Sequence, residues 1–451
     1  MTTAEAEALP ASFTAEELEN SAPFDFEKRL RGEAGLALLE NVLAYLDEKE
    51  ACSGTRQRKR KPKDEEVRRR TLDSLLANLL SLWLNRVDAT RFLALPFGQN
   101  DYAHTGLSLK AMQRFRDALQ QGGYIAVAPG FRKVDAVELG KPFGRRTRIR
   151  ATDQMIEWFE EAGAHWPSIR RVAERGVIHI RKAIEDVGPE PNNVTNCRPV
   201  MERINARLEA ASIELPDDAW ARVRRKAEPG ESDDKDSYLA YAGDDTAKVL
   251  RRIFSHSWER GGRIYGGWWM HLPKAERRHL TIDGECTVEL DYAQLHPTLL
   301  FVRVGPVPDM DPYAIPELEC DRIRDLGKRT FQRLLNSTSA RSGAGISLRA
   351  GPGDNALLPP GLTFSTYLSR FKSRLASISQ WFGTGEGMSL QREDSDLAVR
   401  ILDQMDQADV LPLPIHDSFI VQRRYEGLLR KAMEQAFEEK YGVTPPIKGL
   451  E

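Results

Sequence analysis

The most informative stretch of the chain is Leu411-Pro-Leu-Pro-Ile-His-Asp-Ser-Phe-Ile-Val-Gln422, which predicts two short apolar strands with a charged pair, His416 and Asp417, between them. Burying a carboxylate beside so many hydrocarbon side chains is costly unless its charge is compensated, and a bound metal ion is a common compensation. A second carboxylate, Asp291, has the same setting, because Thr287-Val-Glu-Leu-Asp-Tyr-Ala293 alternates as a strand does. Two such aspartates are the minimum needed to hold a pair of divalent ions for phosphoryl transfer.

The composition is that of a globular protein with room for two or three domains. The chain has 451 residues, of which 41% are hydrophobic and 29% charged. Its net charge is -2, so any affinity for nucleic acid must come from local clusters of its 65 Lys and Arg residues. The four cysteines are scattered, without a CxxC pair, which favours a reducing cytoplasm over a disulfide framework. We see no signal peptide and no apolar run of 18 residues, and we expect a cytoplasmic protein without a membrane partner.

Four short motifs follow one another in the C-terminal half. They are Glu259-Arg-Gly-Gly-Arg-Ile-Tyr265, Asp291-Tyr-Ala-Gln-Leu-His296, Arg324-Asp-Leu-Gly-Lys-Arg-Thr-Phe-Gln-Arg-Leu-Leu-Asn336 and His416-Asp-Ser-Phe419. In this order and spacing they resemble the polymerase domain shared by family A DNA polymerases and the single-subunit phage and mitochondrial RNA polymerases. The match covers somewhat under half the chain. It implies a compact right-hand domain with palm and fingers over residues 237–451.

The resemblance also implies roles for individual residues. Asp291 and Asp417, with the backbone carbonyl of Tyr292, would hold two Mg²⁺ ions, for which Mn²⁺ can substitute, and the two aspartates would be catalytic. The alternative for both is a buried ion pair with a nearby arginine. Arg324 and Lys328 are four residues apart, so both cations project from one face of a helix. That face would bind the phosphates of the incoming nucleotide, unless it is simply a solvated basic face.

Further residues are assigned by position in the motifs. The nucleotide site would also include Gln294, His296 and Asn336, and the template and primer strands would contact Gly262, Arg263 and His416.

The chain departs from the family pattern where the sugar of the nucleotide is selected. His296 stands where many family A DNA polymerases have a Glu that excludes a ribose 2′-hydroxyl, and Asn336 stands where both subfamilies usually have an aromatic residue. Ser418 and the pair Lys328-Arg329 are similar to the RNA polymerase versions of their motifs, whereas the motif that begins at Asp291 is similar to the DNA polymerase version.

We therefore expect a template-directed nucleotidyltransferase that uses nucleoside triphosphates on a DNA template or primer–template in DNA replication. DNA synthesis is the favoured reaction, and RNA synthesis or priming is the alternative. An alternative from another functional class is a DNA-binding protein that is similar to a replication initiator and has an inactive polymerase domain. A metal-dependent nuclease using the same aspartates is a further alternative.

Residues 25–151 predict a mainly helical region that ends in a basic hairpin. Glu66–Val87 and Ser108–Gln121 read as helices, with Ser108 as the N-cap of the second, and Tyr124–Ala128 reads as a strand. A turn-rich stretch and a second, strongly basic strand, Arg145–Arg150, follow. The order resembles a winged helix-turn-helix, in which Ser108–Gln121 would enter a groove of DNA and the wing would touch phosphates. The alternative is a small α/β domain with a charged edge strand. The wing residues are Arg145, Arg146, Arg148 and Arg150.

The remaining segments complete an α+β fold. Residues 1–24 predict a disordered lead-in, and residues 152–236 a helical connector before the polymerase-like domain. The basic run between Arg56 and Lys63 is typical of a solvated linker, with a non-specific phosphate contact as the alternative.

Overall fold

The computed structural model describes residues 13–52, 60–103, 105–138, 141–172, 176–181, 187–227, 244–318, 321–339 and 342–450. The chain folds as two compact units, each built from three separate segments. Unit 1 comprises residues 1–176, 215–249 and 267–277, and unit 2 comprises residues 177–214, 250–266 and 278–451. The units therefore do not divide at the predicted boundaries after residues 151 and 236, because the chain passes repeatedly between them.

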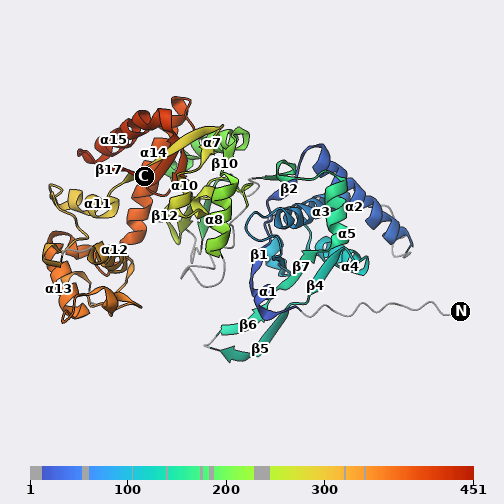
Figure 1. The fold of residues 1–451 in the computed structure, drawn as a ribbon, viewed down its shortest axis with the longest axis horizontal. Coiled ribbons are helices and arrows are strands. Elements are labelled where there is room, and N and C mark those ends of the chain that lie inside the picture. Colours follow the sequence, from blue (N-terminus) through green and yellow to red (C-terminus); the bar gives the residue numbers. More distant parts are fainter. Residues whose placement is uncertain are drawn as a thin grey trace. The chain divides into compact units, whose positions relative to one another are not determined.

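Unit 1 combines a helical layer with a small sheet (Figure 1). Its helices α2 and α3 carry most of the core, in which Leu38, Val42, Leu72 and Leu76 are fully buried. The elements are, in chain order, α1 (Ala15–Glu19), β1 (Ser21–Pro23), β2 (Lys28–Leu30), α2 (Gly32–Cys52), α3 (Pro62–Trp83), β3 (Phe92–Leu95), η1 (Gln99–Tyr102), α4 (Leu109–Gln121), β4 (Ile125–Ala128), β5 (Phe131–Glu138), β6 (Lys141–Arg145), β7 (Thr147–Ala151), α5 (Asp153–Glu161), η2 (Trp166–Ser168), β8 (Ile169–Arg171), α8 (Asp217–Ala227), η3 (Trp268–His271) and α10 (Lys274–Arg277).

The predicted helix Ser108–Gln121 and strand Tyr124–Ala128 are confirmed as α4 and β4, and the predicted second strand corresponds to β7, but the stretch between these two strands, predicted as turn-rich, contains β5 and β6. The Ser108 hydroxyl accepts a hydrogen bond from the Ala111 amide at 3.2 Å and so caps α4, whose Met112, Phe115 and Leu119 face the core. The four-stranded sheet has the order β1-β3-β7-β4, with β1 parallel to β3 and the other pairs antiparallel. Between β4 and β7 the hairpin of β5 and β6 extends away from the rest of the unit (Figure 1).

The described part of the predicted lead-in is ordered. From Phe13 onward it contains α1 and β1, and β1 pairs with β3. The ring of Phe13 packs edge-on against Phe92 at 4.9 Å, and Leu18 is buried in the same cluster. The prediction of disorder is therefore wrong for residues 13–24, because these tertiary contacts stabilise a segment whose own sequence has little periodicity. Residues 1–12 lie outside the described residues.

The predicted connector, residues 152–236, is not a separate element. Its helix α5 packs on α2 in unit 1, α6 (Asn192–Thr195) and α7 (Arg198–Ala210) belong to unit 2, and α8 returns to unit 1. Residues 228–236 lie outside the described residues.

Unit 2 is built around a six-stranded sheet with the order β10-β13-β14-β16-β15, in which β17 also pairs with β14. Leu290 and Phe419 of this sheet are fully buried, and α15 packs against its strands and against α14. A second sheet has the order β12-β11-β9. Beyond α6 and α7, the elements are β9 (Ile178–Arg181), β10 (Ile213–Glu214), β11 (Arg251–Ser255), β12 (Ser257–Tyr265), β13 (Thr281–Ile282), β14 (Glu285–Tyr292), α11 (Leu295–Val304), η4 (Pro316–Leu318), α12 (Asp321–Asn336), η5 (Gly343–Gly345), η6 (Asp354–Leu357), α13 (Phe364–Arg374), η7 (Ala376–Trp381), α14 (Gly387–Gln407), β15 (Leu413–Ile415), β16 (Ser418–Gln422), η8 (Arg423–Tyr425), α15 (Glu426–Tyr441) and β17 (Ile447–Leu450).

The structure is thus a mixed α and β protein with several small sheets. Among the described residues, no helix is both long enough and apolar enough to cross a membrane.

Candidate active site

The central sheet of unit 2 brings Asp291 and Asp417 together. Strand β14 pairs antiparallel with β16, and the register sets Asp291 opposite Ser418, the residue that follows Asp417. The Tyr292 amide donates a hydrogen bond to the Asp417 carbonyl oxygen at 3.3 Å, which ties the two segments together at this point. Two carboxylates that are far apart in the sequence are therefore neighbours at one end of adjacent strands.

The backbone at this end of the sheet adopts conformations that are unfavourable for residues with side chains. His416 and Asp417 form a two-residue turn between β15 and β16, and His416 has a φ of 58°. Gln294, which precedes α11, has a φ of 59°. Left-handed backbone at residues other than glycine costs free energy and is common at functional sites, where the surrounding fold enforces it. Both segments that carry an aspartate therefore have a strained residue within three positions of it.

A lysine from the last strand faces the aspartate pair. Lys448 on β17 lies opposite Asp291 on β14, and its Nζ is 3.1 Å from Asp291 Oδ2. The Asp291 side chain is only 18% exposed. Burial, and after it the negative charge of Asp417, raises the pKa of Asp291 to about 6 even though Lys448 acts in the opposite direction. Lys448 therefore compensates only part of the negative charge of the two aspartates.

The predicted metal ligands can be compared with the coordination that Mg²⁺ prefers. Carboxylate oxygens are the ligands that Mg²⁺ prefers, and it commonly binds through one or two carboxylates together with water and substrate phosphates. Among the described residues, no group of three or more His, Cys, Asp or Glu side chains is placed to hold a metal ion. The Tyr292 hydroxyl donates to the Met433 carbonyl oxygen at 2.5 Å in the core. The Tyr292 hydroxyl is therefore engaged in the core, and the metal-binding role of its main-chain carbonyl stays a prediction.

The two predicted phosphate-binding cations lie on α12. Arg324 donates from Nε to Asp311 Oδ2 at 2.5 Å, and its guanidinium lies 5.6 Å from the ring centroid of Tyr313. Lys328 is exposed, one turn further along the helix. Burial, and then the charge of Asp417, raises the pKa of the Tyr313 phenol, and Asp291 contributes in the same direction. Tyr313 therefore lies within electrostatic reach of both aspartates.

Close packing fixes α12 against the segment that carries Tyr313. At Gly327, which lies between the two cations on the helix, a Cβ atom would overlap the carbonyl oxygen of Tyr313. The Tyr313 ring also packs edge-on against Phe331 at 5.8 Å. Asp311 and Tyr313 belong to none of the sequence motifs, and no sequence pattern identifies them. Only the fold places them beside Arg324.

Arg263 and His296 belong to a buried cluster centred on Asp394. The Asp394 side chain is fully buried, and its Oδ2 lies 2.5 Å from Arg263 Nη2 and 3.0 Å from His296 Nε2. Burial alone would lower the pKa of Arg263, but the Asp394 carboxylate raises it, with a smaller contribution from Asp417. Arg263 is thus held near the aspartate pair by an internal partner. The predicted contacts of Arg263 with template and primer, and of His296 with the nucleotide, would have to be made from within this cluster.

Gly262 and His416, the other residues predicted to contact template and primer, have protein neighbours of their own. The Gly262 carbonyl oxygen accepts hydrogen bonds from Arg252 and Ser395, so this glycine anchors β12 in the core. The ring of His416 packs edge-on against the exposed Tyr265 at 5.5 Å.

Asn336 ends α12 and is exposed, and its Nδ2 donates to the Gln332 carbonyl oxygen at 2.8 Å. Its carboxamide also lies against Gly387 of α14, where a Cβ would overlap it. The Asn336 side chain therefore lies where α12 and α14 meet.

In unit 1, two of the four arginines of the predicted wing are engaged by other parts of the unit. Arg148 Nε donates to the Leu18 carbonyl oxygen at 3.1 Å. Arg150 donates to the Thr90 carbonyl oxygen at 3.2 Å and packs over Phe92. The other two differ, since Arg145 packs over Phe131 at 5.3 Å and the Arg146 side chain is 54% exposed, 3.7 Å from Asp101.

The comparisons with known proteins do not assign a family. No protein-family model matches the chain, and no curated protein matches it with significance.

Proposed function

We propose that unit 2 is a template-directed nucleotidyltransferase, with DNA synthesis as the favoured reaction. The observation that carries the proposal is the pairing of β14 with β16, which sets Asp291 beside Asp417 and leaves their charge only partly compensated. Paired carboxylates of this kind suit enzymes in which divalent cations stabilise the attacking and leaving oxygens of an in-line displacement. In the reaction, the primer 3′-oxygen forms a bond to the α-phosphorus of the nucleotide while the bond to the pyrophosphate oxygen breaks.

The surrounding residues have roles consistent with this chemistry. Asp291, Asp417 and the Tyr292 carbonyl would hold Mg²⁺, which would neutralise the triphosphate and activate the 3′-hydroxyl. Lys328 is exposed on the same face of α12 as Arg324, so the two cations can bind phosphate oxygens once Arg324 exchanges Asp311 for the ligand. The exposed ring of Tyr265, beside His416, offers a surface on which a base can stack.

Unit 1 supports a DNA-binding role. Its strands β3, β7 and β4 are adjacent in this order, with α4 directly before β4 and the β5–β6 hairpin between β4 and β7. This is the arrangement expected of a winged helix with α4 as its recognition helix. Side chains of the types that read base edges lie on the exposed positions of α4. These positions are Lys110, Gln113, Arg114, Asp117, Gln120 and Gln121.

RNA synthesis or priming is the second candidate, because the position expected to exclude ribose holds His296. Its side chain is buried and bound to Asp394, so no carboxylate from this position faces the nucleotide. A DNA-binding protein with an inactive polymerase domain is the candidate from another class.

Primer extension tests these proposals together. A labelled DNA primer–template is incubated with Mg²⁺ and either deoxynucleoside or ribonucleoside triphosphates, with the wild-type chain, Asp417→Asn and the control Asp409→Asn. Asp409 is 97% exposed and lies outside the site. Extension by the wild type and the control, lost in Asp417→Asn, would support nucleotidyl transfer, and the productive nucleotide set would identify the sugar. If neither set is incorporated, with or without a primer, the inactive DNA-binding protein becomes the better account.

A further inference from the structure

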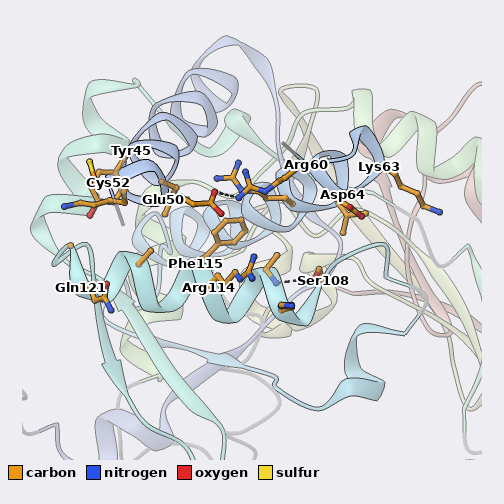
Figure 2. Close-up of a pocket in the computed structure, with 18 residues that line it drawn as sticks. Tyr45, Glu50, Cys52, Arg60, Lys63, Asp64, Ser108, Arg114, Phe115 and Gln121 are labelled. Atoms are coloured by element: carbon orange, nitrogen blue, oxygen red, sulfur yellow. Dashed lines mark hydrogen bonds and ion pairs between the residues drawn. The ribbon is translucent and has the colours of Figure 1, made fainter. Parts of the chain in front are cut away.

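A long groove in unit 1 runs between α4 and the facing ends of α2 and α3. Its volume is about 1470 Å³. Figure 2 shows Arg60 and Lys63 beside the start of α3, and Ser108 and Arg114 on α4. Pockets for single small molecules usually measure about 300–1,000 Å³. The size of this groove therefore favours an extended ligand over a single nucleotide.

Cationic side chains dominate the lining, which includes six of them and only two acidic ones. Two of the six are held by the protein itself. Arg60 pairs with Glu50, and Arg68 pairs with Asp47 at 2.7 Å and with Glu65 at 2.9 Å. The other four are exposed, and within the described part of the chain they have no ion pair. They are Lys49, whose ammonium lies 5.5 Å from the ring centroid of Tyr45, and Lys63, Lys110 and Arg114. The groove thus offers four cations, contributed by three helices, to a polyanion.

The floor of the groove does not suit the stacking of bases. Phe115 is buried, and the Arg68 guanidinium covers its ring at 5.8 Å. Tyr45 packs edge-on against Tyr124 and Trp158. With both aromatic residues engaged by protein neighbours, contacts in the groove would be made to phosphates and not to base faces.

The position of the groove beside α4 indicates which polyanion it would bind. Lys110 and Arg114 belong both to the groove and to the outward face of α4 that the proposed winged helix would present to DNA. A duplex engaged by that face would carry one of its strands along the groove. Two arginines of the predicted wing, Arg148 and Arg150, are less available for phosphate contacts, because they lie on β7 and are bound by the protein itself.

We propose that the groove between α4 and the ends of α2 and α3 binds the sugar–phosphate backbone of double-stranded DNA through Lys49, Lys63, Lys110 and Arg114. The choice of a duplex rests on the DNA-binding role proposed for unit 1. It does not depend on nucleotidyl transfer in unit 2. Binding through this groove is independent of sequence, since it uses phosphates alone.

The test is fluorescence anisotropy with the full-length chain and a labelled duplex of mixed sequence, without nucleotides or Mg²⁺, over about 50 to 200 mM salt. The test variant is Lys63→Gln with Lys110→Gln. The matched control is Lys274→Gln with Lys431→Gln, two exposed lysines, one in each unit, that do not line the groove and lie outside the basic run before α3. Arg114→Gln alone serves as a second test if the double variant changes the circular dichroism spectrum.

Each phosphate contact adds about 0.9 to the slope of log affinity against log salt. We expect the double variant to reduce this slope by about two and to weaken binding by about tenfold or more at low salt, with the control unchanged. An unchanged slope overturns the proposal, as does a wild-type chain that fails to bind duplex at about 50 mM salt. A loss confined to a single-stranded probe overturns the assignment to a duplex. Primer extension is scored separately, so a silent polymerase with an intact groove effect would refute only the proposed function.

Discussion

Replacing Asp417 by Asn should abolish nucleotide incorporation and at the same time stabilise unit 2. An ordinary aspartate has a pKa near 3.9, and that of Asp291 is raised to about 6. Keeping Asp291 ionised in the folded protein therefore costs roughly 3 kcal/mol, at 1.36 kcal/mol per pKa unit. Burial is the largest cause and the charge of Asp417 the second. We assign about 1 kcal/mol to the repulsion between the two carboxylates.

The sign of the pH dependence follows from the raised pKa. Below about pH 4, Asp291 is protonated in both the folded and the unfolded chain, so the penalty is absent. Between about pH 4 and pH 6 the unfolded chain ionises first, and the free energy of unfolding falls as the pH rises. Above about pH 6 the full penalty applies. The gain from Asp417→Asn should therefore be about 1 kcal/mol at pH 8 and smaller at pH 5.

Hydrogen exchange measured by mass spectrometry on peptides from β14 and β16 would report this gain locally, which suits a chain with two units. Adding Mg²⁺ at pH 8 should slow exchange in the wild type, since bound ligand at ten times its Kd contributes about 1.4 kcal/mol. The variant should lose most of that effect. Faster exchange in Asp417→Asn at pH 8, or retained incorporation, would refute the reasoning.

Three further predictions concern single side chains. Asp394→Asn should lower the free energy of unfolding by about 3–5 kcal/mol in urea titrations, because it leaves Arg263 without its buried carboxylate. The control Asp403→Asn, at an exposed ion pair on the same helix, should change the free energy of unfolding by less than about 1 kcal/mol. Equal effects of the two substitutions would contradict the prediction. Lys448→Gln should tighten Mn²⁺ binding by up to about fivefold in electron paramagnetic resonance titrations, since the ammonium no longer competes for Asp291, and weaker binding would count against this role. Gly327→Ala should destabilise the protein by about 1–3 kcal/mol through its overlap with the Tyr313 carbonyl, measured by thermal unfolding, whereas Gly427→Ala, where the structure is open, should be neutral or stabilising.

Local patterns in the sequence predicted the parts of the site that depend on neighbouring residues. Alternation identified the strand that carries Asp291, and the flanking apolar runs identified the turn that carries Asp417. The hydroxyl of Ser108 was recognisable as an N-cap because capping depends on residues within one turn of a helix. Such signals depend on residues that are close together along the chain, so they can be recognised in the sequence.

The features that sequence patterns missed depend on long-range pairing. Lys448 reaches Asp291 only because β17 pairs with β14. Asp394 lies on α14, in the middle of an amphipathic pattern, and nothing there indicates that its side chain would bind both Arg263 and His296. The division of the chain into units could not be predicted either, because each unit gathers segments that are separated by parts of the other.

Single-turnover incorporation of one nucleotide tests the central claim most directly. A labelled primer–template with one templating base is mixed with Mg²⁺, the complementary triphosphate and, in separate reactions, wild type, Asp291→Asn or Asp417→Asn. We predict a primer longer by one nucleotide with the wild type alone, and only when the triphosphate matches the template. Extension at the wild-type rate by either aspartate variant would contradict a role for the pair Asp291 and Asp417 in nucleotidyl transfer.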